Sequence, residues 1–261
     1  MHLILTSFPH HIGLHNVSER IPEGNAATKY FLPYDYEMVR VKTSISVLLV
    51  WMTSFFSSGL KVVVLHGKGA SSAVYRQRLK PMIDEVQFRL GQENVDFVFL
   101  DAPHVIETGK DAGLFEWWRL PPGVRSFNAR EYSGVEESFH LIEKEEPYDV
   151  LLGLSQGAIL SSIIIANSLE KQLGHMPKGA ILSGAAYPAP YRELLESLQA
   201  NCFTNSLHCI GENDEINPPA DALKIKNMFG GKELIHDKGH VLPLDSASIS
   251  IYTEFLKKML Q

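Results

Sequence analysis

Residues 148–169 read YDVLLGLSQGAILSSIIIANSL and contain the G-x-S-x-G pentapeptide GLSQG at 153–157. The short apolar run before the pentapeptide, 148–152, predicts a buried strand, and the Ile- and Leu-rich run after it, 158–169, predicts a buried helix. A serine flanked by glycines between a strand and a helix is typical of a nucleophile elbow, a tight turn that exposes the hydroxyl. The glycines matter because side chains there would collide with the strand or the helix. Ser155 is therefore the candidate nucleophile.

The composition indicates a globular protein and argues against one broad class of function. The chain has 261 residues, of which 45% are hydrophobic, enough to bury the core of one α/β domain. Its net charge of −6 at pH 7 argues against nucleic-acid binding, which needs a basic surface. Cys202 and Cys209 form no disulfide framework and have no metal-ligand spacing. This cysteine usage favours a reducing compartment. We therefore expect a cytoplasmic location, and a nuclear location is also compatible with it. The oligomeric state stays open.

Strand-like and helix-like segments alternate from residue 60 onward, with short loops between them. This alternation is typical of an α/β protein with a doubly wound, mostly parallel sheet and helices on both faces. Strands are predicted over residues 61–65, 96–100, 148–152, 180–182, 207–210 and 234–236. Helices are predicted over 72–91 with a break or restart at Pro81, from a capping box of Ser133 and Glu136 to about Glu145, over 158–174, and over 249–260. Residues 60–261 are therefore predicted to form one α/β domain.

The first 59 residues do not follow this alternation, and we treat them as an N-terminal extension of uncertain structure. An uncharged run covers residues 43–60, but its serines and threonines make it marginal for crossing a bilayer. Three interpretations stay open: a membrane anchor, an additional packed or loosely attached segment, or residues outside the mature protein. The third is motivated by Met52, because translation from there would give a short lead into the first strand.

A catalytic serine needs an acid and a base, which in the α/β-hydrolase order follow the serine as acid and then histidine. The segment GEND at 211–214 directly follows the predicted strand 207–210 and ends at Asp214. Catalytic groups of parallel sheets lie beyond the carboxyl ends of the strands, so Asp214 is the candidate acid. Glu212 and Glu215 are nearby alternatives with less suitable position or reach, and a purely turn-forming role for Asp214 is the competing interpretation.

His240 is the candidate base, because it lies in the loop after the last predicted strand. There it would take the serine proton and return it to the leaving group. His236 falls inside the strand and is interpreted as structural. The spacing of the two histidines would suit a metal pair on a helix, but Gly239 argues against a helix there, so no metal is expected.

The oxyanion hole is predicted to use two backbone N–H groups, those of Gln156 and Lys68. Lys68 lies in the flexible loop HGKG at 66–69, which follows the first strand. The Lys68 side chain could attract acidic substrates, although a solvated lysine is the simpler interpretation. Nucleotide binding by this loop is disfavoured, because the loop has neither the third glycine of the dinucleotide fingerprint nor a G-K-[ST] sequence.

Taken together, these residues resemble the FSH family of serine hydrolases, which are α/β-hydrolases, over the chain from about residue 60 to the C-terminus. The points of similarity are LHG at 65–67, DAP at 101–103, PYD at 147–149, GLSQG at 153–157, ILSG at 181–184, Asp214, and GHVLP at 239–243. The resemblance implies an α/β-hydrolase fold with Ser155, Asp214 and His240 at the positions of the family's triad. It also implies hydrolysis of carboxylic esters or, as in some members, acyl thioesters. This chain departs from the family at Lys238, where glycine is common, and in its first 59 residues.

A substrate pocket is expected beside the segment LFEWWR at 114–119, because the family carries aromatic residues there. In this interpretation Trp117 and Trp118 line an apolar groove for the acyl group, and Arg119 lies at its rim. The alternative is that one tryptophan packs in the core and the other covers it.

The sequence therefore predicts a serine carboxylesterase or acyl thioesterase that needs no cofactor and acts on a small-molecule ester or thioester. Two alternatives stay open. One is a non-catalytic ligand-binding protein on a hydrolase scaffold. The other is an acyltransferase, since the exclusion of water, which decides the acceptor, cannot be read from the sequence. The acyl group is not specified either.

Overall fold

A computed structural model describes residues 59–171 and 174–261. The predicted N-terminal extension and the uncharged run 43–60 lie outside the described residues, apart from Gly59 and Leu60. Among the described residues, none of the helices has the length and apolar character that crossing a bilayer requires.

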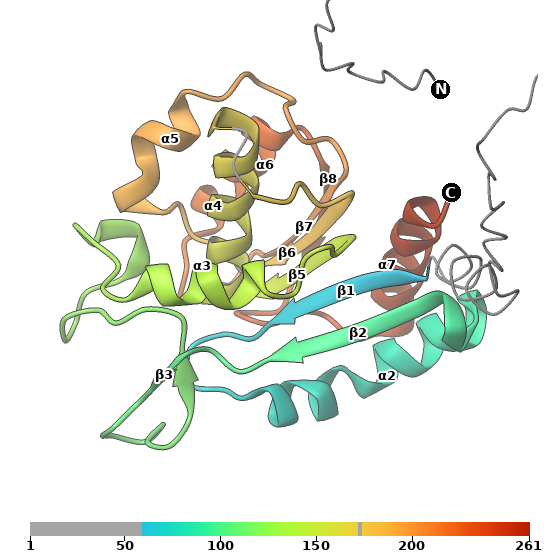
Figure 1. The fold of residues 1–261 in the computed structure, drawn as a ribbon, viewed down its shortest axis with the longest axis horizontal. Helices are drawn as coiled ribbons and strands as arrows, with labels where there is room; N and C mark the ends of the chain where they lie inside the picture. The colour runs from blue at the N-terminus through green and yellow to red at the C-terminus, as the bar shows by residue number, and fades with distance from the viewer. Residues whose placement is uncertain (1–58, 172–173) are drawn as a thin grey trace, which may run out of the picture. The chain divides into compact units, whose positions relative to one another are not determined.

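A six-stranded sheet forms the centre of the described unit (Figure 1), and every neighbouring pair in it is parallel. The strands are β1 (Leu60–Leu65), β2 (Val95–Leu100), β5 (Val150–Leu154), β6 (Gly179–Ser183), β7 (Ser206–Gly211) and β8 (Lys232–His236). Their spatial order is β2-β1-β5-β6-β7-β8. Two further short strands, β3 (His104–Val105) and β4 (Phe115–Glu116), pair antiparallel with each other. Each of the six strands predicted from the sequence is present in the sheet, with ends that differ by one or two residues.

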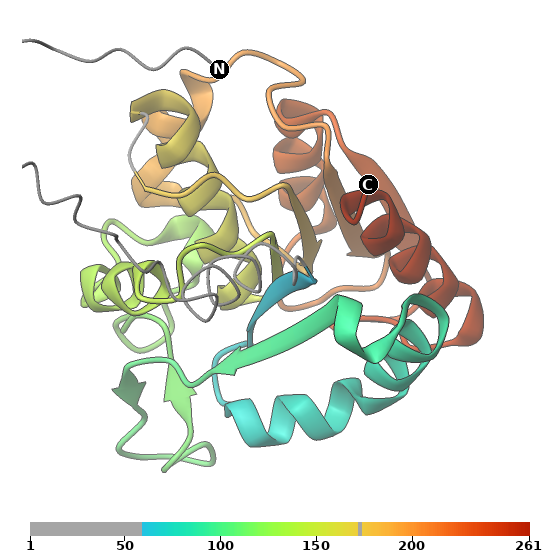
Figure 2. The same ribbon diagram turned by 45° about the vertical axis from the view of Figure 1, so that its right-hand side comes forward.

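Helices cover both faces of the sheet. They are α2 (Ser72–Leu90), α3 (Val135–Glu143), α4 (Gln156–Lys171), α5 (Arg192–Glu196), α6 (Pro219–Phe229) and α7 (Ser246–Met259), with short 3-10 turns at η1 (Gln92–Asn94), η2 (Ser126–Asn128) and η3 (Ala189–Tyr191). In Figures 1 and 2, α2 and α7 lie on one side of the sheet, and α3, α4, α5 and α6 lie on the other. The predicted doubly wound α/β fold is confirmed.

The two faces of the sheet belong to two separate apolar cores. Val62 and Val64 of β1 pack with the buried residues of α2 and α7, whereas Val63 and Leu65 pack with those of α3, α4 and α6. This division follows from the strand itself, because successive side chains point to opposite faces. Strands buried on both faces need continuous apolar sequence, which is why β1 reads LKVVVL and β5 reads VLLGL.

Two helix predictions were wrong in detail. Helix α2 continues through Pro81 without a break. Pro81 is exposed, and so is Gln77, whose carbonyl loses its helical partner there and can bond to water instead. The predicted capping box at Ser133 does not form: Gly134 is the N-cap of α3 and makes no side-chain cap. Ser133 is instead held by a backbone hydrogen bond from Arg119 to its carbonyl oxygen.

The strand order places a site-forming crevice between β1 and β5. From β1 the chain moves outward to β2, and it then returns to add β5 on the other side of β1. Ligands of open α/β sheets bind outside the carboxyl ends of the strands at such a reversal. Ser155 directly follows β5, and the predicted oxyanion loop directly follows β1, so both predicted elements reach this crevice.

Candidate active site

Ser155 occupies a tight turn between β5 and α4, with a backbone φ of 55°. A side chain at Gly153 would overlap the backbone of Gly157, and a side chain at Gly157 would overlap the carbonyl oxygen of Leu65 in β1. The positive φ is unfavourable for a serine, so the packing of strand and helix must hold it. The sequence therefore folds as the G-x-S-x-G pattern predicts, and the elbow is pressed against the neighbouring strand.

His240 and Asp214 form a close pair. The imidazole Nδ1 of His240 lies 2.7 Å from Oδ2 of Asp214, and because an ionised carboxylate only accepts, Nδ1 carries the proton. The other carboxylate oxygen, Oδ1, accepts backbone N–H bonds from Ile216 and Asn217, each at 2.9 Å. Burial acts to raise the pKa of Asp214, but the hydrogen bonds from His240 and these backbone groups outweigh it and hold the pKa below its ordinary value. Asp214 is thereby kept as a carboxylate that orients His240.

Gly184, at the carboxyl end of β6, packs directly against this pair. Its φ is 57°, and a Cβ there would lie 2.9 Å from Cε1 of His240 and 3.4 Å from Oδ2 of Asp214. The Asn217 side chain donates to the carbonyl oxygen of Gly184 at 2.7 Å, which ties the loop that carries Asp214 to the end of β6. Only a residue without a side chain leaves room for the pair in this position.

Ser155 and His240 line one cavity of about 670 Å3. Nε2 of His240 is buried and has no hydrogen-bond partner among the described residues, whereas Nδ1 is bonded to Asp214. The structure thus joins the predicted base and acid directly and places the predicted nucleophile in the same cavity as the base. The alternative acids, Glu212 and Glu215, are exposed.

His66 holds the loop that follows β1. It is buried, and its Nε2 accepts a hydrogen bond from the backbone N–H of Ala102, at 3.1 Å. Nδ1 therefore carries the proton, and it donates to the carbonyl oxygen of Gly67 at 2.8 Å. Burial lowers the pKa of His66, which favours this neutral form. His66 is not among the site residues predicted from the sequence, although its position at the end of the first strand indicates a residue that could position the oxyanion loop.

The two predicted oxyanion donors lie on segments that pass next to Ser155. A Cβ at Gly67 would lie 3.2 Å from Cβ of Ser155, so the loop carrying Lys68 runs beside the serine. The N–H of Lys68 has no acceptor in the part of the chain that the structure describes. Gln156 is the first residue of α4, where N–H groups have no intrahelical acceptor. Its side chain is fixed by Trp117 N–H, which donates to Oε1, and by the Trp118 carbonyl, which accepts from Nε2.

The predicted pocket residues lie elsewhere, and this part of the prediction is corrected. Trp117 and Trp118 are completely buried, and neither lines the cavity beside Ser155. The Trp117 indole N–H donates to the carbonyl oxygen of His66 at 2.7 Å, and the Trp118 indole stacks on Tyr132 with ring centres 4.3 Å apart. Arg119 is exposed and does not line the cavity either. Both tryptophans therefore support the walls of the site from the core.

Two other side chains differ from or extend the predictions. The Lys68 side chain is not simply solvated: its Nζ lies 2.5 Å from Oε2 of the buried Glu116. His236 ends β8, as expected for a residue in a strand, and neither of its ring nitrogens has a hydrogen-bond partner among the described residues.

The sequence of this chain is similar to a family of serine hydrolases and to individual esterases. Residues 55–251 match the family model described as "Serine hydrolase (FSH1)". The chain belongs to the FSH1 serine hydrolase family. This FSH1 chain is 28% identical over 228 residues to an esterase of Aedes aegypti, covering 78% of each protein. It is 27% identical over 225 residues to the esterase OVCA2 of Xenopus tropicalis, covering 77% of this chain and 94% of that protein.

The fold of this FSH1 hydrolase also has solved relatives. A crystal structure of esterase PE8 superimposes with a TM-score of 0.57 over 78% of this chain and 94% of that chain, at 21% sequence identity. At this identity the likeness concerns the fold. Together with the family assignment, it confirms the resemblance to FSH hydrolases and the prediction of a serine hydrolase enzyme.

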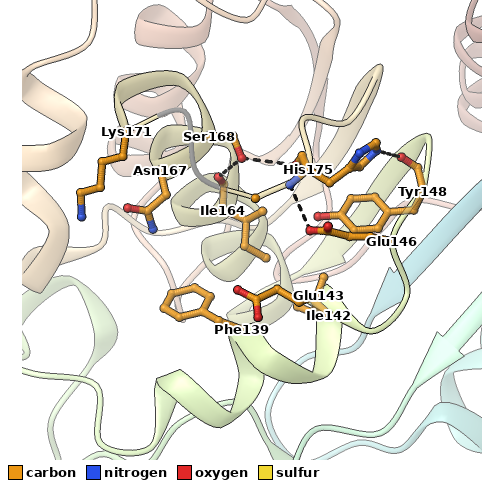
Figure 3. A pocket seen from close by; sticks show the side chains of 11 residues that line it. Phe139, Ile142, Glu143, Glu146, Tyr148, Ile164, Asn167, Ser168, Lys171 and His175 are labelled. Atoms are coloured by element: carbon orange, nitrogen blue, oxygen red, sulfur yellow. Dashed lines mark hydrogen bonds between the residues drawn. The ribbon is translucent and has the colours of Figure 1, made fainter. Parts of the chain in front are cut away.

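A second cavity of about 260 Å3 lies between α3 and α4 (Figure 3), and Ser155 is not among the residues that line it. Tyr148, which precedes β5, contributes to its wall, so this cavity is at the amino end of the strand whose carboxyl end carries Ser155. Its polar groups are largely paired within the protein. The His175 backbone N–H donates to Glu146, the His175 ring bonds to the Tyr148 carbonyl, and Ser168 Oγ donates to backbone carbonyls.

Proposed function

We propose that this FSH1 hydrolase cleaves carboxylic esters or acyl thioesters through an acyl-enzyme on Ser155. The observation that carries the proposal is the cavity that Ser155 and His240 line together, with His240 hydrogen-bonded to Asp214. Both of these relatives are named as esterases, which favours an ester as the substrate.

In the first half of the reaction, Ser155 Oγ attacks the acyl carbonyl carbon while Nε2 of His240 accepts the hydroxyl proton. Asp214 stabilises the imidazolium and keeps its orientation. His240 then returns the proton to the leaving alcohol or thiol as the C–O or C–S bond breaks. Water attacks the acyl-enzyme with the same proton transfers in the second half. The carboxylic acid leaves, and the Ser155 hydroxyl is restored.

The oxyanion that forms in each half-reaction is proposed to bind the backbone N–H groups of Lys68 and Gln156. Both groups belong to segments next to Ser155, and the Lys68 N–H has no competing acceptor in the described part of the chain. Fixed N–H donors of this kind contribute about 3 kcal/mol each to lowering the barrier. His66 is a positioning residue here. It donates to the carbonyl oxygen of Gly67, and this carbonyl belongs to the same peptide group as the Lys68 N–H.

The test is hydrolysis of p-nitrophenyl esters and S-acyl-N-acetylcysteamine thioesters of graded chain length by the purified full chain. Ser155→Ala should lower kcat by roughly 10³-fold or more, since the nucleophile of the acyl-enzyme is lost. Ser197→Ala, an exposed serine outside the cavity, is the matched control and should retain the activity. Labelling by a fluorophosphonate probe should disappear in both Ser155→Ala and His240→Ala.

Unchanged turnover by Ser155→Ala would refute the proposal. An acyl adduct found by mass spectrometry on any residue other than Ser155 would also refute it. If the acyl group moves to an added alcohol faster than to water, the same acyl-enzyme serves acyl transfer, which was the alternative considered from the sequence.

Two coarser proposals accompany the reaction. We propose residues 60–261 as the catalytic unit, since every group assigned above lies within it; a chain starting at Met52 should then keep the wild-type kcat. A cytoplasmic location, favoured by two cysteines that are both free in the described residues, stays a prediction that cell fractionation would test.

A further inference from the structure

The charge of the catalytic cavity is opposite to the charge of the chain. The protein carries a net charge of −6, yet the charged residues that line the cavity, apart from His240, are four cations and one acid. The cations are Lys68, Arg78, Lys110 and Arg125, and the acid is Asp111. A local excess of positive charge in an acidic protein concentrates anions at that place.

Three of these cations are available to a ligand. Lys68 is paired with Glu116, so its charge is already balanced. Arg78, Lys110 and Arg125 are exposed, and none of them forms a salt bridge with the described residues. A solvated cation alone is unremarkable, but here three of them border the cavity that holds the reacting groups.

The three cations come from three separate segments of the chain. Arg78 belongs to α2, Lys110 to the turn between β3 and β4, and Arg125 to the segment just before η2. They are far apart in the sequence and come to one cavity only through the fold, so no local sequence pattern predicts the group. All three line the cavity that also holds Ser155 and His240.

Apolar residues line the same cavity as the cations. They are Val74, Leu120, Val124, Leu154 and Ile216, and two of them, Val74 and Ile216, have more than a third of their surface exposed. A pocket that combines apolar walls with a few charged groups selects ligands that combine the same two features.

We propose that the substrate is an amphipathic, anionic acyl ester or thioester. Its anionic group, a carboxylate or a phosphate outside the scissile bond, is bound by Arg78, Lys110 and Arg125. The apolar part of the acyl chain contacts the apolar walls, and the scissile carbonyl reaches Ser155. This inference rests on the proposed ester or thioester hydrolysis. The anion can belong to the acyl group or to the leaving group, and the experiment separates these two sources.

The experiment compares matched substrates with the purified full chain. For the acyl side, p-nitrophenyl hydrogen suberate is compared with p-nitrophenyl octanoate, which has the same chain length and no carboxylate. For the leaving-group side, octanoyl-coenzyme A is compared with S-octanoyl-N-acetylcysteamine, which has no phosphate. In at least one pair the anionic substrate should have the higher kcat/KM. The ratio should fall as the ionic strength rises from about 0.01 to 0.5 M, because exposed charges are screened.

The variant that tests the residues is the triple substitution Arg78→Gln, Lys110→Gln and Arg125→Gln. It should lower the anionic-to-neutral ratio of kcat/KM about tenfold, since each exposed charge pair contributes a factor of about two to three. The control is Arg130→Gln, Lys232→Gln and Lys257→Gln, three exposed cations outside the cavity that remove the same net charge. It should leave the ratio unchanged.

The outcomes separate this inference from the proposed function. If the neutral esters are hydrolysed through Ser155 but neither ratio exceeds one, or the cavity triple and the control triple behave alike, the anionic substrate is refuted and the hydrolase proposal stands. If Ser155→Ala retains turnover of the neutral esters, the proposed function fails instead. The salt dependence of the wild-type enzyme gives an independent reading should the triple variant fold poorly.

Discussion

The cavity beside Ser155 and the cavity of Figure 3 lie at opposite ends of the same strand and differ in how their polar groups are satisfied. At the carboxyl end of β5, Nε2 of His240 is buried without a partner in the described residues, and Ser155 holds a positive φ. At the amino end, in the cavity of Figure 3, His175 is bonded through both its backbone and its ring. Strained backbone and buried polar groups without partners are found together at functional sites, which favours the carboxyl end of β5 as the proposed site of chemistry.

The largest expected effect concerns the acid of the carboxyl-end site. Asp214→Asn should lower kcat for p-nitrophenyl octanoate by about 10³- to 10⁴-fold, because an amide in place of the carboxylate favours the wrong tautomer of His240. Glu143→Gln in the second cavity, which also replaces a carboxylate with an amide, should change kcat less than twofold. Equal losses in both variants would mean that the distinction between the two ends is not a functional one. Steady-state kinetics at neutral pH decide this.

The next effect compares two glycines with positive φ. Gly184→Ala should lower kcat by about 10- to 100-fold, because its methyl group would displace His240 and Asp214 from their positions. Gly174→Ala is the matched control at the second cavity: its φ is also positive, but the nearest atom to its Cβ would be 3.8 Å away. It should cost about 1 kcal/mol of stability and leave kcat unchanged. Kinetics together with urea unfolding separate displacement from strain, and a full kcat for Gly184→Ala would contradict this role for Gly184.

A third comparison fills each cavity with a large side chain. Val124→Trp should lower kcat/KM for p-nitrophenyl octanoate about tenfold, since Val124 lines the catalytic cavity and the larger side chain would displace the acyl chain from contacts worth about 1–3 kcal/mol. Asn167→Trp occupies the second cavity and should leave kcat/KM within a factor of about two of the wild type. A larger loss from Asn167→Trp would make the second cavity part of the functional site.

The smallest expected effect on activity is that of a buried histidine outside both cavities. Burial lowers the pKa of His208 to about 3, from an ordinary value of 6.5. The folded state therefore keeps His208 neutral, while the unfolded state takes up a proton below pH 6.5. Stability from this residue is complete above pH 6.5 and is lost as the pH falls toward 3, by about 1.4 kcal/mol per pH unit. His208→Leu should remove this slope from urea unfolding curves at pH 6 to 4 and keep kcat. A variant with the wild-type slope would show that His208 is protonated when folded.

The sheet could be predicted from the sequence, and the candidate catalytic residues could be proposed from it, because each has a local signature. The sequences of β1 and β5 are almost continuously apolar, as strands buried on both faces require. GLSQG has glycines at the two positions where the strand and the helix leave no space for a side chain. Asp214 and His240 follow strand ends, and parallel strands bring their carboxyl ends to one edge. These predictions needed only near neighbours in the chain.

The residues that surround the reacting groups could not be predicted in this way, because contacts distant in sequence position them. Trp117 looks like a pocket residue in the sequence, but its indole is bound by the carbonyl of His66, 51 residues away. Arg78 and Arg125 look like ordinary surface charges until the fold brings them to one cavity. Ser133 has the sequence of a cap, but its backbone bond to Arg119 keeps it outside the helix.

The positive φ of Ser155 predicts a conflict between catalytic activity and thermal stability at this position. Glycine is the residue that adopts a φ of 55° without penalty, so Ser155→Gly would relieve about 1 kcal/mol of strain while it removes the proposed nucleophile. A library screened for thermal survival alone would therefore enrich proteins that have lost the proposed nucleophile. Directed evolution of this enzyme toward higher temperatures has to include turnover in the selection, and stabilising changes are best sought away from the elbow.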